Sequence, residues 1–95
     1  MSDVVASRQV TIVNPQGLHA RPADLFARLA SRFAAKIEVV KDGQRANGKS
    51  ILDILMLAAV CGSRLTIEAR GGDAEEAVDA LALLLSRLPA DYNSE

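Results

Sequence analysis

The sequence predicts a two-layer α/β (α+β) domain in which helices cover one face of a small antiparallel sheet, in the order β-α-β-β-α-β-α. Three observations lead to this class. Residues 64–70 alternate between apolar and polar side chains, as a half-buried antiparallel strand does. Two longer segments carry apolar residues at steps of three and four, the period of an amphipathic helix. Asp42-Gly43 separates two strand-like runs and is a strong hairpin signal.

The first part of the chain predicts a strand, a turn and a helix. The strand covers Arg8–Val13 and ends at Asn14-Pro15-Gln16-Gly17, a cluster of turn-forming residues. The helix covers Ala20–Ala34, with Leu29 at the edge of its apolar face. That face consists of residues spaced three or four apart: Ala23, Phe26, Ala30 and Phe33.

A hairpin and a short helix are predicted next. Lys36–Lys41 is strand-like, and Gln44–Ala46 returns as a shorter edge strand. Ser50 is a good N-cap for a second helix that ends near Leu57, and Asp53 follows the cap by three residues.

The last part predicts a strand and a long helix. The strand Arg64–Arg70 ends at Gly71-Gly72, and Asp73 followed by Glu76 has the spacing of a capping box. Pro89 closes the helix, and we expect residues 89–95 to form a frayed tail. The helix has one core stripe: Ala74, Ala77, Val78, Leu81, Leu84, Leu85 and Leu88.

Composition narrows the function classes. We expect one domain over residues 1–95 with a core at about 8–88. The longest apolar run, Ile54–Cys61, is much shorter than the roughly 20 residues that cross a bilayer. The N-terminal residues do not resemble a secretion signal. The lone Cys61 is interpreted as a small filler residue and is consistent with the cytoplasm.

The net charge of −1 conceals an asymmetry along the chain. Residues 21–49 carry seven basic and three acidic side chains, whereas residues 50–95 carry three basic and eight acidic ones. With only three aromatic residues, the basic segment does not have the composition of a nucleic-acid surface. We therefore expect an acidic partner surface or a phosphate group.

His19 is the only histidine, and it falls where a turn gives way to a helix. Helix starts attract anions because their first backbone N–H groups lack intrahelical partners, and Pro22 loses no hydrogen bond there. One interpretation is that the imidazole attacks phosphorus while Arg21 stabilises the phosphoryl oxygens. The alternative is an imidazole that caps the helix or lies in solvent.

Two more features point to a partner. Arg21, Arg28 and Arg32 fall within about 40° of one another on a helical projection, opposite the apolar face. This basic stripe is either a solvated face or a binding surface. In the segment SILDILML, residues 50–57, nearly every residue after the cap is apolar, which predicts either an exposed docking patch or a deeply buried helix.

The stretches GLHARPADLF, NGKSILDI and GSRLTIEARGGDAEEAVDAL, in this order, resemble the HPr family, the histidine-containing phosphocarriers of the bacterial phosphotransferase system. The resemblance runs from about Arg8 to Leu88 without a large gap. It implies an open-faced sandwich of four antiparallel strands and three helices, and a carrier rather than an enzyme. It also implies that the protein works in the cytoplasm as a monomer, without cofactor or metal.

The resemblance assigns roles to individual residues. It implies that Enzyme I, charged by phosphoenolpyruvate, phosphorylates a ring nitrogen of His19, and that the group passes to a histidine of an enzyme IIA domain. Arg21 would stabilise the phosphate, and Ser50 would be a candidate regulatory site for an HPr kinase/phosphorylase. The expected partner-binding residues are Arg28, Lys49, Ile51, Leu52 and Leu55, the apolar ones filling hollows and the basic ones meeting acidic rims.

Two positions depart from the family pattern. Ala20 stands where a hydroxyl residue is also common, and Asp53 where glycine or a basic residue is usual. They keep open a nitrogen-related regulatory branch, in which an HPr-like protein phosphorylates a IIA component without moving sugar. A docking module without phosphate transfer is disfavoured because His19 is present. A hydrolytic enzyme is disfavoured because no second catalytic group or metal-ligand cluster accompanies it.

Overall fold

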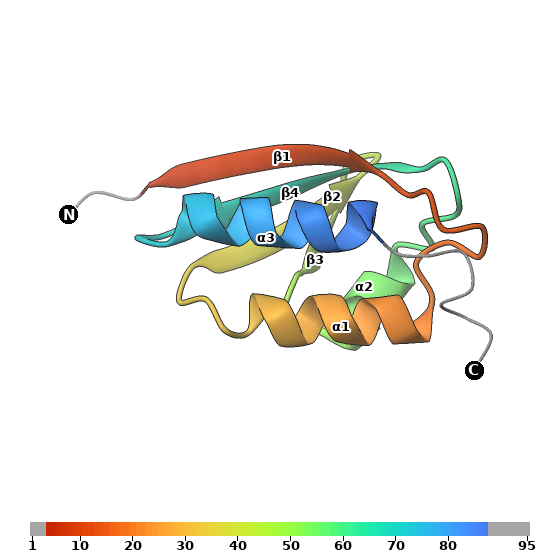
Figure 1. The fold of residues 1–95 in the computed structure, drawn as a ribbon, viewed down its shortest axis with the longest axis horizontal. Coiled ribbons are helices and arrows are strands. Elements are labelled where there is room, and N and C mark those ends of the chain that lie inside the picture. The colour runs from red at the N-terminus through yellow and green to blue at the C-terminus, as the bar shows by residue number, and fades with distance from the viewer. Residues whose placement is uncertain (1–3, 88–95) are drawn as a thin grey trace.

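The computed structural model describes residues 4–87 and has the predicted element order (Figure 1). The described elements are β1 Val5–Thr11, α1 Ala20–Ala30, β2 Lys36–Lys41, β3 Gln44–Asn47, α2 Ile51–Met56, β4 Arg64–Arg70 and α3 Ala74–Ser86. The predicted frayed tail at 89–95, its Pro89 and the core position Leu88 lie outside the described residues.

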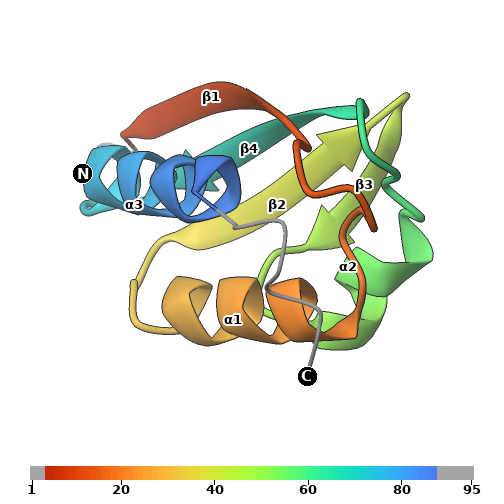
Figure 2. The same cartoon turned by 45° about the vertical axis from the view of Figure 1, so that its right-hand side comes forward.

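The strands form one antiparallel sheet in the order β1-β4-β2-β3. Figures 1 and 2 show the three helices on the same side of this sheet, so its other face is open. The alternation in β4 is confirmed, because Leu65, Ile67 and Ala69 are buried beneath the helices. From α3, Ala77, Val78, Leu81 and Leu85 complete the core. The predicted fold class is confirmed.

The hairpin turn is also confirmed. Asp42 and Gly43 both have positive φ, at 50° and 84°, as a two-residue turn between twisted strands requires. The bounds of β1 differ from the prediction, since the strand covers Val5–Thr11 rather than Arg8–Val13. Its length follows its partner: Val5 lies opposite Arg70, and Thr11 lies opposite Arg64.

Helix α1 ends at Ala30, four residues earlier than predicted. The backbone N–H groups of Arg32 and Phe33 bond to carbonyls three residues back, which is the geometry of a tightening turn. The next two N–H groups, of Ala34 and Ala35, bond to the carboxylate of Asp73 at 2.8 and 2.9 Å. These donors are held by a distant residue and are not available to continue the helix.

The predicted capping box at Asp73 is therefore wrong, because its carboxylate makes no cap hydrogen bond to α3. The hydrogen bond from Ala34 is the main cause that lowers the pKa of Asp73, with the Ala35 bond and the positive charge of Lys49 adding to it. Asp73 thus ties the loop after α1 to the start of α3, a contact that spans the sequence.

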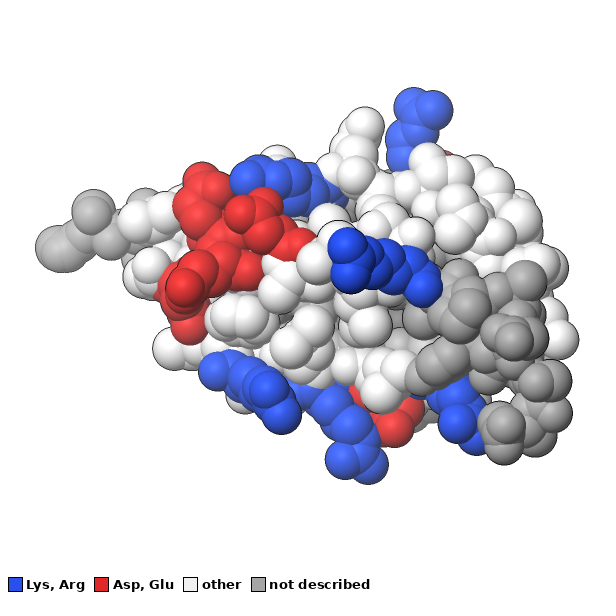
Figure 3. Space-filling view, in the orientation of Figure 1, with Lys and Arg blue, Asp and Glu red and all other residues white. Residues whose placement is uncertain are grey.

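The charge asymmetry along the chain becomes an asymmetry across the molecule. Figure 3 shows acidic side chains over the N-terminal half of α3 and basic side chains along α1. The exposed acids of α3 are Glu75, Glu76 and Asp79. Arg8 of β1 pairs with Glu75 at 3.1 Å and with Asp79 at 2.9 Å.

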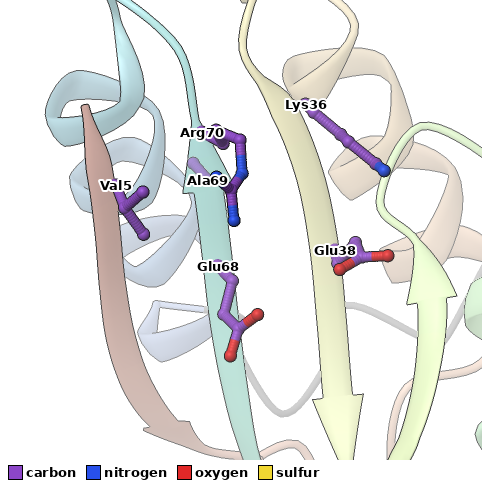
Figure 4. A pocket seen from close by; sticks show the side chains of 6 residues that line it. All are labelled: Val5, Lys36, Glu38, Glu68, Ala69 and Arg70. Atoms are coloured by element: carbon purple, nitrogen blue, oxygen red, sulfur yellow. The ribbon is translucent and has the colours of Figure 1, made fainter. Parts of the chain in front are cut away.

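The open face of the sheet is charged. Glu38 and Glu68 lie directly opposite each other on β2 and β4, and Arg45 bonds to both carboxylates at 2.9 and 2.7 Å. These bonds, that to Glu68 foremost, raise the pKa of Arg45. A shallow hollow of about 100 Å³ lies on this face (Figure 4). It is lined by Val5, Lys36, Glu38, Glu68, Ala69 and Arg70. Charged side chains that pair with one another, as Arg45 does with both glutamates, are typical of a sheet face exposed to water.

Candidate functional site

A tight turn leads the chain into α1. Asn14, only 1% exposed, accepts a hydrogen bond from the Gln16 N–H on its side-chain oxygen and one from the Gly17 N–H on its carbonyl, at 3.0 and 2.8 Å. Gly17 has φ of +75°, a conformation that side chains disfavour. The turn predicted at Asn14–Gly17 is confirmed, and it sets the direction in which His19 leaves the sheet.

The same turn is fastened to the loop that follows α2. The Leu18 N–H donates to the Ala59 carbonyl at 2.8 Å, and the Leu18 side chain is buried. A Cβ at Gly17 would lie 2.6 Å from that carbonyl oxygen, so only glycine allows this approach. His19 and the end of α2 are consequently held together at one end of the molecule.

His19 is the N-cap residue of α1, and its side chain is partly buried. Its backbone is extended, and its carbonyl accepts the first intrahelical hydrogen bond, from Ala23, at 3.0 Å. The imidazole makes no capping hydrogen bond, so the interpretation of His19 as a side-chain cap is wrong. The ring stands beside the start of an 11-residue helix, where backbone N–H groups and the helix dipole favour an anion.

Only part of the predicted basic stripe lies on α1: Arg21 and Arg28 belong to the helix, whereas Arg32 follows its end at Ala30. Arg21, Arg28 and Arg32 are all exposed. Arg21 belongs to the first turn, next to His19. Arg28 bonds through Nε to both carboxylate oxygens of Asp24, one turn earlier, at 3.0 Å. Part of the positive charge predicted for this stripe is therefore neutralised within the helix itself.

Lys49 has a structural contact that the sequence did not predict. Its ammonium group donates to the Phe33 carbonyl at 2.7 Å, just after the end of α1. A carbonyl in the final turns of a helix lacks an intrahelical donor, and a lysine there is favourable. Lys49 thus fastens the start of α2 to the end of α1.

Three of the predicted partner-binding residues meet at one hollow. It has a volume of about 260 Å³ and lies between α1 and α2. Its lining residues are Asp24, Ala27, Arg28, Ser31, Lys49 and Ile51. Arg28, Lys49 and Ile51 are therefore brought together around a feature that a protruding side chain can enter.

The predicted N-cap of α2 is confirmed. The Ser50 hydroxyl accepts a hydrogen bond from the Asp53 N–H at 3.2 Å. The reciprocal half of a capping box is not formed, because the Asp53 carboxylate accepts from the Asn47 N–H at 3.3 Å instead. Asp53 is exposed and places a negative charge on the solvent side of α2.

Helix α2 buries Ile54, with Leu57 buried just after its end, and exposes three of its other apolar residues. Ile51 is 39% exposed, Leu52 68% and Met56 72%. The prediction of an exposed apolar patch is confirmed, and the alternative of a deeply buried helix is excluded. We call Ile51, Leu52 and Met56 the α2 face.

The membership of this patch was predicted incompletely. Leu55 is only partly exposed and packs against the core. Met56 was missed, although its spacing of four residues from Leu52 puts both on one side of a helix. Val60 and Val13 are 65% and 53% exposed. The Val60 backbone approaches Gly17 in the loop that carries His19, so this exposed valine lies where the two loops meet, a relation that no sequence signal gives.

The remaining features of the site are a cysteine, the question of metal ligands and the question of membrane-spanning helices. Cys61 is exposed in this loop, with Sγ 3.8 Å from the Val13 carbonyl oxygen. Within residues 4–87, no three His, Cys, Asp or Glu side chains gather as a metal site, and no helix is long and apolar enough to cross a bilayer. The arrangement offers an imidazole nucleophile, an anion-stabilising helix start and a protein-docking patch.

Comparison with known proteins identifies the family. Residues 6–87 match the family model described as the PTS HPr component phosphorylation site. The phosphocarrier protein HPr of Cupriavidus necator is 40% identical over 79 residues, covering 83% of this chain and 89% of that protein. The phosphocarrier protein NPr of Shewanella violacea is 45% identical over 78 residues, covering 82% and 86%.

A solved structure agrees with these relatives. The phosphocarrier protein HPr from Bacillus anthracis superposes with a TM-score of 0.81 at 46% identity, covering 85% of this chain and 96% of that one. The family match at residues 6–87 includes the segment with His19 and Arg21. The chain belongs to the HPr family of phosphocarrier proteins of the phosphotransferase system.

Proposed function

We propose that His19 is the residue that carries the phosphoryl group. Phospho-Enzyme I, charged by phosphoenolpyruvate, donates the group, and a histidine of an enzyme IIA domain accepts it. The observation that carries the proposal is the position of His19: it is the N-cap residue of α1, so its imidazole stands at the helix end where backbone N–H groups and the helix dipole favour the anionic phosphoryl group.

The transfer is a pair of in-line displacements. A neutral ring nitrogen of His19 attacks phosphorus as the bond from phosphorus to the donor imidazole breaks. The donor ring carries a proton on its second nitrogen and therefore leaves as a neutral imidazole, while phospho-His19 keeps the proton on its own second ring nitrogen. The second step repeats this chemistry with His19 as the leaving group. The charge on the phosphoryl oxygens is stabilised by the helix start and by Arg21, so positioning and electrostatics supply the catalysis.

Docking brings the two imidazoles into line. The α2 face supplies apolar contacts beside the hollow of Arg28, Lys49 and Ile51. Leu52 and Met56 are the main anchors, with Leu55 contributing from the edge because it is partly buried. The basic side chains of α1 match acidic rims on Enzyme I and on the IIA domain.

The proposal also concerns the branch of the phosphotransferase system in which the protein acts, either sugar uptake or nitrogen-related regulation. We favour phosphate transfer to a IIA component for sugar uptake, regulation or both. A nitrogen-related regulatory role is the alternative, and the NPr relative at 45% identity supports it. Asp53, exposed on α2 beside the apolar anchors, distinguishes this surface from a purely basic and apolar one. Transfer rates to purified IIA proteins of both kinds would separate the two.

The phosphate test uses phosphoenolpyruvate and purified Enzyme I. We expect one acid-labile phosphate per chain, absent in His19→Ala and formed more slowly in Arg21→Ala, with an order-of-magnitude loss of rate for removing one stabilising group. Arg64→Ala is the matched control, since this exposed arginine begins β4. An unmodified protein, or label found on Ser50 alone, contradicts the proposal.

Ser50 is proposed as a regulatory site for an HPr kinase/phosphorylase. It precedes Ile51 directly, so a phosphate there adds charge to the docking surface without breaking the sheet. Ser50→Asp and Ser50→Asn both retain an N-cap acceptor, which is worth about 1 kcal/mol, but only Asp adds charge. We expect equal stability and slower Enzyme I transfer for Ser50→Asp alone. Equal transfer rates would remove the support for regulation.

We expect this carrier to act in the cytoplasm as a monomer, with Enzyme I and IIA proteins as partners. Sedimentation at working concentration tests the oligomeric state. A dimer that covers the α2 face would contradict the docking scheme, because the same surface cannot hold a second copy and Enzyme I together.

A further inference from the structure

Helix α3 is more apolar than its contact with the sheet requires. Its buried residues are Ala74, Ala77, Val78, Leu81 and Leu85. Outside this stripe, Leu83 is 50% exposed and Ala80 is partly exposed. These two continue a line that begins at Glu76 and Asp79, because residues at steps of three and four share one side of a helix. Helix α3 therefore carries a second stripe, half acidic and half apolar.

This second stripe borders a groove between α3 and the end of α1. The groove is an open, shallow hollow of about 470 Å³, lined by Phe33, Glu76, Asp79, Ala80 and Leu83. Phe33 lies just beyond α1 and packs partly against the core. None of these five residues belongs to the α2 face or to the loop of His19. The 11 residues of α1 make a helix about 16 Å long at a rise of 1.5 Å per residue, and His19 and Phe33 lie beyond its opposite ends.

The α3 side of the groove is acidic, whereas the docking surface at His19 carries the basic side chains of α1. Helix α3 exposes the carboxylates of Glu75, Glu76 and Asp79, and the Arg8 guanidinium pairs with two of them, those of Glu75 and Asp79. Within residues 4–87, Glu76 forms no ion pair. Figure 3 shows this acidic area on the α3 side and basic side chains on the α1 side. A basic segment of a partner protein therefore suits the α3 side of the groove, next to Glu76 and Asp79.

We propose that this groove docks a basic amphipathic helix of a partner protein. Two apolar side chains of that helix contact Phe33, Ala80 and Leu83, and its lysine or arginine residues face Glu76 and Asp79. This is the helix-in-groove mode of recognition, in which apolar anchors give affinity and flanking charges give orientation. Because His19 lies at the far end of α1, a bound partner leaves the α2 face open and tethers the carrier in either phosphorylation state.

The test uses a synthetic helix of about four turns, with leucine on one side and lysine on the other. Its backbone-amide shift map is recorded on the whole ¹⁵N-labelled protein. We expect perturbed signals at Phe33 and residues 76–83 and unchanged signals at residues 51–56. A peptide with glutamate in place of lysine, and a shuffled peptide of the same composition, should not bind. Perturbation centred on α2 overturns the proposal.

Variants separate this site from the phosphoryl-transfer surface. Leu83→Asn should weaken peptide binding about tenfold, the cost of losing one buried leucine, and Glu76→Lys should weaken it in a salt-dependent way. Leu52→Asn is the matched control, because it changes another exposed leucine in the same way but on the α2 face. We expect the two α3 variants to accept phosphate from Enzyme I at the normal rate. Unchanged peptide affinity in both overturns the proposal, whatever becomes of His19.

A second copy of the chain is the competing occupant. A dilution series of the protein alone distinguishes it, since self-association through the groove would broaden the signals of residues 76–83 at high concentration. That result would also overturn the proposal. Concentration-independent signals, together with selective peptide binding, support it.

Discussion

The residue that immediately precedes a helix has a different role at each of the three helices. Ser50 and His19 both stand immediately before a helix, but only the serine hydroxyl caps its helix. Asp73 also precedes a helix, and its carboxylate serves two N–H groups of a distant loop. All three residues stand directly before a helix, and the tertiary surroundings decide what each side chain binds.

Asp73 gives a prediction about pH. Its pKa in the folded protein is below the ordinary value of 3.8, so its stabilising effect is complete above that value and is lost as the pH falls through the lower, folded-state pKa. Asp73→Asn should lower stability at neutral pH and flatten the acid side of the profile. Urea unfolding between about pH 2 and 6 measures both effects.

Glu76→Gln is the matched control for this prediction. It removes a carboxylate from the first turn of the same helix, but one that does not hold the loop after α1. We expect its pH profile to follow that of the unsubstituted protein. If Asp73→Asn also gives a parallel profile, the carboxylate contributes nothing to stability through these two hydrogen bonds.

At the scale of elements, the loop of His19 and the loop after α2 act as one unit. Their contact is the approach of Gly17 to Ala59 and Val60, reinforced by the Leu18 hydrogen bond. Neither loop belongs to a helix or a strand, so the geometry of the site depends on contacts between the two segments, and the approach at Gly17 is one of them. This approach contributes to the fixed relation between the α2 face and His19.

Gly17→Ala tests that relation, and Gly62→Ala controls for the backbone. Both glycines have positive φ, at 75° and 92°, but an added Cβ has open space at Gly62 and a carbonyl oxygen 2.6 Å away at Gly17. Gly62→Ala should cost about 1 kcal/mol, the conformational cost alone, and leave phosphoryl transfer unchanged. Gly17→Ala should cost more and slow transfer. Equal effects on both measurements would show that the contact does not position His19.

The whole molecule shows which features can be predicted from the sequence and which cannot. Element order, the Asp42-Gly43 turn and the Ser50 cap were predictable because each depends on residues that are close together in the chain. The early end of α1 was not, since it depends on Asp73, 38 residues or more away. The contact of Lys49 with the Phe33 carbonyl was missed for the same reason.

The same distinction between local and long-range contacts decides which features of the functional site could be predicted from the sequence. Periodicity predicted that some of SILDILML is exposed, since the segment is apolar on every side. It did not predict which residues, because burial of Ile54 and partial burial of Leu55 depend on how α2 lies against the core. Val13 and Val60 adjoin the site only through folding of two loops, and periodicity has no meaning in loops.

The separation of charge across the molecule predicts how Enzyme I transfer depends on salt. If the basic stripe of α1 steers the carrier toward an acidic partner, the transfer rate at low carrier concentration falls with ionic strength, because the screening length is about 10 Å at 0.1 M salt. Asp24 neutralises Arg28 in this stripe. Asp24→Asn should therefore raise the low-salt rate a few-fold and steepen its fall with salt. Asp42→Asn makes the same change in net charge at the β2–β3 turn, away from α1, and should leave the rate unaltered.

Rapid-quench measurement of phosphate transfer across a salt series gives the comparison. Because the effect of steering vanishes when charges are screened, all three proteins should converge at high salt. A low-salt rate that Asp24→Asn does not raise would mean that Enzyme I recognises α1 by shape and apolar contact alone.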